Sequence, residues 1–390
     1  MLPPMFRRDF LERLPFRTVV AWTALVCALG AVSTVASSTP DNLLTRPDAA
    51  RLVWEQHRMI GLSVLVLPLL VLTAAAARPA RPLHVLLALL ALSPAVPALA
   101  SAPAAALVPV TALVVFVSGA LALVVTLLRV RSDGFRPRTV GLGLAALAAF
   151  AFGLSVLGTH TATALEHFVQ VLTVAALGAL AEPAADEAPR VGFAVALALL
   201  AIAAYLPLSP DAPMIIALAP VGLALNAAGV VFIGRQKRFP RGAARVALLS
   251  GLALYLEAIA SQVFLQLQEP TIDLRDTFFL SATEHAAWLA LLTLLAADWL
   301  RTREPRAHTS RVPMAAMVLA AVGAQVLLVA QAQLGLRGMP LGYLRYVDSL
   351  TAGHVVAAVG ACTWLAGMLG VVTTTRRAPP PAPVVTDVFA

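Results

Sequence analysis

Five of the seven histidines lie near the same end of long apolar runs, and this shared level is the first sign of chemistry in the sequence. Imidazole is the commonest metal ligand among side chains, and a titratable group within a membrane is costly and faces the protein interior. The alternative is that each imidazole only hydrogen-bonds a neighbouring helix. We expect a single buried polar site, or a metal or haem layer, built from His57, His160, His167, His285 and His354.

Three of these histidines recur at a regular interval. His57, His167 and His285 each follow a glutamate by one or two residues, and they lie in the second, sixth and tenth apolar runs, four runs apart. Neighbours in sequence do not share a helix face, so the glutamate next to a histidine cannot orient it. The recurrence predicts three four-helix units, each with a histidine near the outer end of its second helix.

Three glutamates fall inside the apolar runs. Within a membrane such a carboxylate either relays protons or stays neutral and hydrogen-bonded to a neighbouring helix. The glutamates are Glu166, Glu257 and Glu284, and the partners expected for the neutral form are Gln170, Gln262 or Gln266.

Composition identifies the solvent in which these residues act. Sixty per cent of the chain is apolar and 12% is charged, which is about half the charge of an ordinary soluble chain. This excludes a soluble globular protein, a disordered chain and a coiled coil. In a soluble protein the net charge of +8 would suggest a nucleic-acid partner, but here it is a topology signal and no nucleic acid is expected. Cys27 and Cys362 lie inside apolar runs and offer neither a disulfide framework nor a CxxC metal site.

The apolar runs predict an all-α integral membrane protein. A bilayer core requires about 20 mostly apolar residues per helix. Twelve runs meet this length, with the third and seventh the shortest, so that eleven or ten spans is the alternative. The runs are 17–37, 57–77, 82–100, 104–128, 139–159, 161–181, 190–208, 212–234, 242–267, 277–299, 313–333 and 349–373.

The basic residues predict how these spans are oriented. With the N-terminus in the cytoplasm, most of the 28 Lys and Arg residues fall in inner loops, as the positive-inside rule requires. The outer side holds only Arg46, Arg51, Arg58, Arg275, Arg337 and Arg345. We therefore expect both ends inside, in a multi-pass protein of a bacterial-type inner membrane. Residues 1–377 form the predicted membrane domain and residues 378–390 a Pro-rich cytoplasmic tail.

Four stretches of the chain resemble subunit I of the haem-copper oxidase superfamily, which includes cytochrome c oxidases and nitric oxide reductases. HRMIGLSVLVLP (57–68) resembles the second span of that family, and the spacing of His160 and His167 resembles the pair that opens the sixth. DTFFLSATEH (276–285) resembles a segment of the tenth span. QAQLGLRGMP (331–340), the most specific of the four, resembles the loop between spans eleven and twelve.

WEQHRMIG (54–61) also resembles NnrS-type haem- and copper-containing membrane proteins and haem A synthase. The eight spans of haem A synthase argue against that family. All three resemblances point to haem.

The main resemblance implies a fold and a cofactor. The fold is twelve transmembrane helices in three pseudo-symmetric groups of four, with haem in the outer half of the membrane. His57 and His285 are the implied axial ligands of one low-spin, bis-histidine haem b, since such a haem needs two imidazoles on opposite faces. The second ring nitrogen of each ligand then needs an acceptor, for which Gln56, Thr283 or a backbone carbonyl is expected.

The haem propionates and the partners follow from the same resemblance. Propionates need cations near the outer surface, and Arg58, Arg337 and Arg345 are the candidates. Besides membrane lipid, the expected partners are other respiratory-type subunits or a cytochrome electron donor.

The catalytic centre of the family is incomplete in this chain. Thr283 stands where the ligand of the high-spin haem belongs, and Val171 stands where the redox tyrosine belongs. No histidine lies between residues 181 and 242, where the resemblance puts two copper ligands. Copper is therefore not expected, because only His167 matches a copper ligand of the family. A copper site would have to be rearranged and built from His160, His167 and His354.

These observations leave three functions open. The first is a haem-binding protein for electron transfer, or for redox or nitric oxide chemistry, without the usual dinuclear oxygen-reducing centre. The second is an aberrant but active terminal oxidase or nitric oxide reductase. The third is a twelve-helix secondary transporter whose histidines bind protons or substrate. The sequence leaves it open whether the chain is an enzyme. It resembles a family of oxidoreductases, but the usual catalytic ligands of that family are absent from it.

Overall fold

The computed structural model describes residues 16–30, 66–77, 81–95, 104–157, 161–181, 242–268, 277–303, 311–339 and 351–374, together with residues 60, 64 and 274. All the extended elements in these ranges are helices. They are a helix at Phe16–Gly30, α3 (Leu67–Ala76), α4 (Arg81–Leu90), α6 (Ala104–Asp133), α7 (Pro137–Leu157), α8 (Thr161–Ala181), α11 (Ala243–Gln268), α12 (Phe278–Arg303), α13 (Arg311–Leu336) and α14 (Thr351–Thr374).

Six of the described helices are long and apolar enough to cross a membrane, namely α6, α7, α11, α12, α13 and α14. The prediction of an all-α, multi-pass membrane protein is therefore confirmed at this level. The predicted runs agree closely with the long helices, and 161–181 coincides with α8. The runs 190–208 and 212–234 lie outside the described residues.

The run 82–100 differs from its prediction. A continuous helix was expected there, but α4 ends at Leu90 and a turn occupies residues 91–94. The Ser93 amide donates to the Leu90 carbonyl in this turn, at an N–O distance of 3.0 Å. Pro94 has no amide hydrogen and disfavours helical backbone at the residue before it, so the helix cannot pass through this point unbroken.

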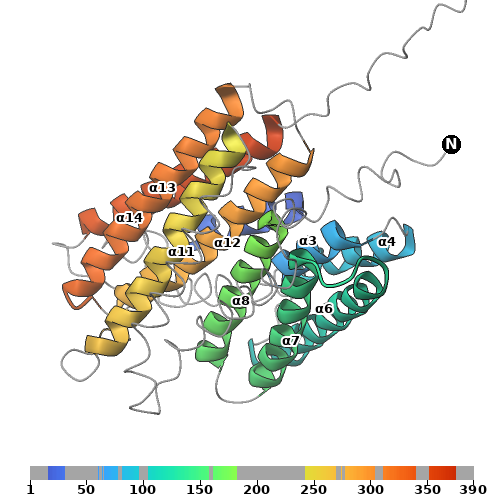
Figure 1. Cartoon of the computed structure of the whole chain (residues 1–390). Coiled ribbons are helices and arrows are strands. Elements are labelled where there is room, and N and C mark those ends of the chain that lie inside the picture. Colours follow the sequence, from blue (N-terminus) through green and yellow to red (C-terminus); the bar gives the residue numbers. More distant parts are fainter. Residues whose placement is uncertain are drawn as a thin grey trace, which may run out of the picture.

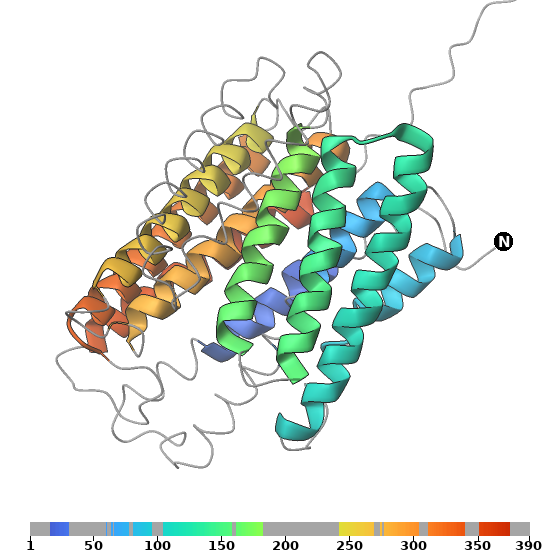
Figure 2. The same ribbon diagram turned by 60° about the horizontal axis from the view of Figure 1, so that its bottom comes forward.

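The helices form one bundle in which α12 is central. In Figure 1, α11, α12, α13 and α14 lie together on one side and α3, α4, α6 and α7 on the other, with α8 between the two sets. Helix α12 packs against α3, α8, α11 and α13. Its membrane-length segment is 72% buried, compared with 33% for α14. Figure 2 shows the long helices running side by side, so that α12 is shielded by its neighbours while α14 lies at the edge.

Glycines allow α13 and α14 to pack at very short range. A Cβ atom added at Gly360 would lie 2.4 Å from the Leu327 backbone nitrogen, and one added at Gly323 would lie 2.2 Å from that of Trp364. Without side chains to separate them, the two backbones touch directly, as in small-residue helix pairs of other membrane proteins.

The contacts between α13 and α14 repeat once per heptad. Three glycines of α14 are spaced seven residues apart, and each meets a residue of α13 seven positions earlier than the partner of the glycine before it. A seven-residue repeat is typical of left-handed helix pairs. The contacts are Gly353 with Leu334, Gly360 with Leu327, and Gly367 with Ala320.

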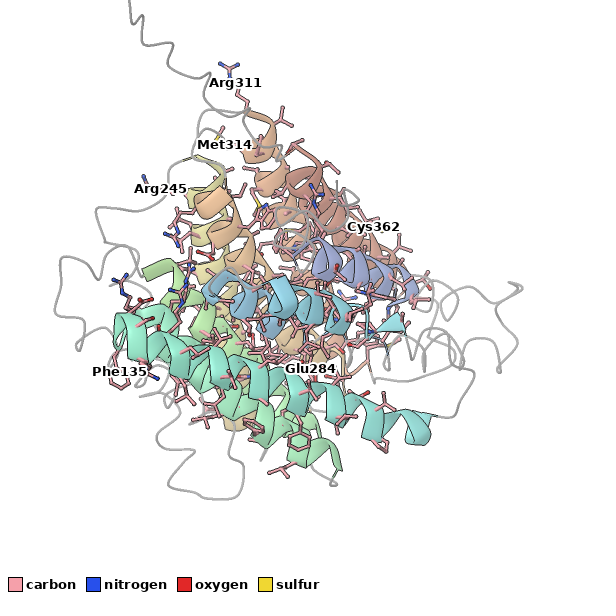
Figure 3. The ribbon with its side chains drawn as sticks, turned by 90° about the vertical axis from the view of Figure 1, so that its right-hand side faces the viewer. Phe135, Arg245, Glu284, Arg311, Met314 and Cys362 are labelled. Atoms are coloured by element: carbon pink, nitrogen blue, oxygen red, sulfur yellow. The ribbon has the colours of Figure 1, made fainter. Side chains whose placement is uncertain are left out.

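The two ends of the bundle can be identified from contacts between helices. At one end Phe16, which begins the first described helix, stacks on Trp299 near the end of α12, with ring centroids 4.9 Å apart. Arg138, at the start of α7, reaches Asp298 at the same level. We call this the Asp298 end. In Figure 3, Phe135 and Arg245 lie at one margin of the molecule, away from Glu284 near the start of α12.

Candidate functional site

His285 lies in the second turn of α12 and is bound to α13. Its Nδ1 atom is 2.9 Å from Oε1 of Gln331, which is buried. With the amide oxygen facing the ring, Nδ1 carries the hydrogen and donates it, and Nε2 keeps its lone pair. The ring makes no other hydrogen bond to the described part of the chain. This is the arrangement that prepares an imidazole to ligate a metal through Nε2.

The partner of His285 differs from the expected one. Thr283 was one of three acceptors expected for the ring, with Gln56 and a backbone carbonyl, but its hydroxyl donates to the Phe279 carbonyl of its own helix, at 3.1 Å. Residues two positions apart in a helix do not face one another, which explains why Thr283 cannot serve. Gln331 was not identified as the partner from the sequence. The available signal was a glutamine in an apolar helix, but Gln333 gives the same signal and is exposed.

Two of the four stretches that resemble the oxidase family lie against each other. The Phe278 amide at the start of α12 donates to the Met339 carbonyl just beyond α13, at 3.0 Å. A Cβ atom added at Gly335 would lie 2.1 Å from the Phe279 backbone nitrogen, so the two helices touch there. The stretches 276–285 and 331–340 therefore form one structural unit, and the pair His285–Gln331 lies within it.

The end of α13 explains part of the GLRGMP sequence. Gly338 has a φ of +74°, which favours glycine. Its amide donates to the Gly335 carbonyl at 2.8 Å, and the Met339 amide donates to the Leu334 carbonyl at 3.1 Å. These two bonds, with the packing of Met339 on Leu334, make up a Schellman helix end. The glycine and the apolar residue after it are thus required by the way in which the helix ends.

His354 lies near the same unit but is oriented by packing. It is fully buried on α14, and its ring meets the edge of Phe278, with centroids 5.0 Å apart and an interplanar angle of 70°. His167 belongs to α8, and the structure describes only its helical backbone. His57, Arg58, His160 and Arg345 lie outside the described residues. The haem pair of His57 with His285 and the rearranged copper site therefore stay predictions.

Two further polar pairs join helices in the half of the bundle away from the Asp298 end. Gln170 of α8 is hydrogen-bonded to Gln262 of α11, and both are buried. Gln325 of α13 donates to Glu257 of α11 at 3.0 Å. The expectation that neutral glutamates bond Gln170, Gln262 or Gln266 stays a prediction, because the side chains of Glu166 and Gln266 lie outside the described part of the chain. The amides pair with each other because α8 and α11 approach at that level.

A charged cluster at the Asp298 end was missed by the sequence analysis. One carboxylate oxygen of Asp298 lies 2.6 Å from an Arg301 nitrogen and 3.2 Å from an Arg138 nitrogen. Arg301 also donates to the Ala179 carbonyl of α8, and Arg138 to the Ala75 carbonyl of α3. The cluster therefore connects α3, α7, α8 and α12. In the sequence these residues appear only as charges near the ends of apolar runs.

Among the described residues, no group of three or more His, Cys, Asp or Glu side chains is arranged to hold a metal ion. A metal or haem site that used His285 would therefore need its other protein ligand from outside the described residues.

Comparison of the sequence with models of known protein families gives no match, and comparison with curated proteins gives none. The resemblance to haem-copper oxidases therefore rests on the four stretches themselves.

Proposed function

We propose that this chain is a haem-binding integral membrane protein that works in electron transfer, or in redox or nitric oxide chemistry, and lacks the usual dinuclear oxygen-reducing centre. The observation that carries the proposal is the bond from His285 Nδ1 to Gln331, which is 2.9 Å long, joins α12 to α13 and is partly buried. An imidazole whose Nδ1 is held by a neutral amide has the tautomer that a haem iron requires.

The residues around His285 fit such a group. Ala282 and Leu289, one turn before and one turn after His285 on α12, are buried and apolar. Gln331 fixes the ring plane from α13. A bis-histidine haem b, when bound, would pass single electrons between a donor and an acceptor. His57 would supply the second axial ligand, and Arg58 and Arg345 would hold the propionates. Arg337, the third candidate for the propionates, is exposed just after α13.

The absorption spectrum of the purified protein tests this proposal. His285→Ala and His57→Ala should each abolish the low-spin haem spectrum, since either change removes an axial ligand. Gln331→Leu should keep the haem but shift its midpoint potential, because the ligand loses its hydrogen bond. His354→Ala serves as the control and should keep the spectrum, because that ring packs on Phe278.

Other outcomes would point to the alternatives. A protein with no Soret band would favour the secondary transporter. Carbon monoxide should leave the reduced spectrum unchanged, because Thr283 offers no ligand for a second, open haem. A carbon monoxide-induced shift together with oxygen uptake would instead favour the aberrant oxidase or nitric oxide reductase.

We further propose twelve spans with both termini in the cytoplasm, arranged in three groups of four. Two features support this topology. Most basic residues fall on one side of the predicted spans, and the described helices that should begin inside, such as α7, start at the Asp298 end. An alkaline phosphatase fused after Arg377 should be inactive and a green fluorescent protein fused there should fluoresce. Active phosphatase at that position would show that the C-terminus is outside.

A further inference from the structure

A groove of about 510 Å³ runs along the outer surface of the α13–α14 pair, which lies at the edge of the bundle in Figure 1. The floor and walls are mostly apolar, with Val326 and Val329 on α13 and Val356 on α14. Small residues of α14, Ala352 and Gly353, leave the space open near the end of α13. The α13–α14 pair lies at the edge of the described bundle, so components of the membrane are the natural contents of the groove.

The polarity of the groove changes along its length. Arg337, the residue after the last one of α13, lies at its mouth, and Gln333 follows one turn deeper. Val329 is a further turn in, about 12 Å below Arg337 at the helical rise per residue. Arg337, Gln333 and Val329 are exposed and form one stripe, because a spacing of four residues keeps them on one face. The groove is therefore cationic at its mouth and has mostly apolar walls below it, and at its deep end Gln325 donates to Glu257 of α11.

Arg337 is available for an anion at this mouth. Its guanidinium has neither a hydrogen bond nor an ion pair with any residue in the described ranges. It lies on the exposed side of α13, whereas Gln331, which holds His285, is buried on another side. A planar guanidinium binds phosphate oxygens through two parallel hydrogen bonds. A ligand at Arg337 is thus separate from one held by His285.

We propose that this groove binds one anionic phospholipid, with the phosphate on Arg337 and an acyl chain along Val329, Val326 and Val356. From its mouth inwards the groove presents a cation, an amide and then an apolar wall. This sequence matches a phospholipid in a membrane, whose phosphate lies at the surface and whose acyl chain points to the centre. A net negative headgroup is favoured over a zwitterionic one, because none of the described residues that line the groove is a carboxylate that could pair with a choline or an ethanolamine. The site does not depend on whether haem is bound.

Native mass spectrometry of the full chain tests the lipid site. The protein is placed in nanodiscs of phosphatidylcholine, or of equal parts phosphatidylcholine and phosphatidylglycerol, and the lipids retained on release are counted. Wild-type protein should retain one phosphatidylglycerol per chain. Arg337→Gln should weaken this retention about tenfold, as expected for loss of a charge-assisted hydrogen bond. Arg337→Lys should weaken it less, because the charge stays and the paired hydrogen bonds are lost.

A second pair of variants separates the groove from the charge. Ala352→Trp fills the groove and should abolish retention with Arg337 in place. Val359→Trp, on an exposed part of α14 that does not line the groove, is the matched control and should retain the lipid as wild type does. Equal retention of both lipids by wild type, or unchanged retention in Ala352→Trp, would overturn the proposal. Displacement of the lipid by inorganic phosphate would also overturn it, because the acyl chain would then contribute nothing.

Discussion

Replacing Gly360 by alanine should separate α13 from α14 and lower the free energy of unfolding by about 3 kcal/mol or more. The added methyl group would lie 2.4 Å from the Leu327 backbone nitrogen and 2.8 Å from its Cα atom. Those atoms belong to the main chain of a helix and cannot rotate away as the end of a side chain would. The whole of α14 must move instead, and with it the contacts that repeat along the pair.

Gly143→Ala in α7 is the matched control. Its added methyl group would meet the Thr126 side-chain methyl at 3.2 Å, a contact that a small adjustment relieves. Alanine also favours a helix over glycine by about 1 kcal/mol, so this variant should be neutral or slightly stabilised. Thermal unfolding in detergent, followed by circular dichroism and gel filtration, would compare the two. Equal stability of Gly360→Ala and wild type would show that the α13–α14 contact is looser than the structure has it.

Replacing Asp298 by alanine should lower the free energy of unfolding by about 3–5 kcal/mol, the cost of breaking a buried ion pair from one side. The carboxylate is shared by Arg138 and Arg301, and the exposed fractions of the three side chains are 9%, 18% and 19%. Without it, two guanidinium groups stay close together with no anion between them. Four helices meet at this cluster, so the loss should loosen the whole Asp298 end.

The measurement for Asp298 needs two comparisons. Asp133→Ala removes a more exposed ion pair with Arg129, in which the side chains are 25% and 28% exposed, and should cost less than about 1 kcal/mol. The double variant Asp298→Ala with Arg138→Ala should be less unstable than the sum of the two single changes, because both act on one interaction. Additive effects would mean that Asp298 and Arg138 contribute independently.

The long helices could be predicted from the sequence because twenty apolar residues in a row have few alternatives in a membrane. The run 82–100 was mispredicted because hydropathy does not record that Pro94 interrupts backbone hydrogen bonding. Hydropathy also treats the glycines of α14 as neutral positions. Their heptad match to α13 becomes visible only when the two helices are placed side by side.

The sequence was enough to predict which histidine belongs to the candidate site, but not which residue holds it. His285 was identified from its residue type and its level in the span, and it proved to be held by a neighbouring helix. Gln331 could not be chosen over Gln333, because the two differ in burial and not in chemistry. Asp298 was missed since a charge near the end of a span normally lies in a loop, whereas here it lies between two arginines of the bundle.

The central position of α12 has a consequence for how the protein is made. Of the six long helices, α12 is the least apolar and also the most enclosed. Transfer of α12 alone from the insertion machinery into lipid would be unfavourable, because the imidazole of His285 and the carboxylate of Glu284 are costly in lipid. Its partners α8 and α11 are synthesised before it, and α13 comes directly after it. Because of this order along the chain, α8 and α11 are already made when α12 enters the bilayer. Packing on α11 can then shield the polar side chains of α12 from lipid during insertion.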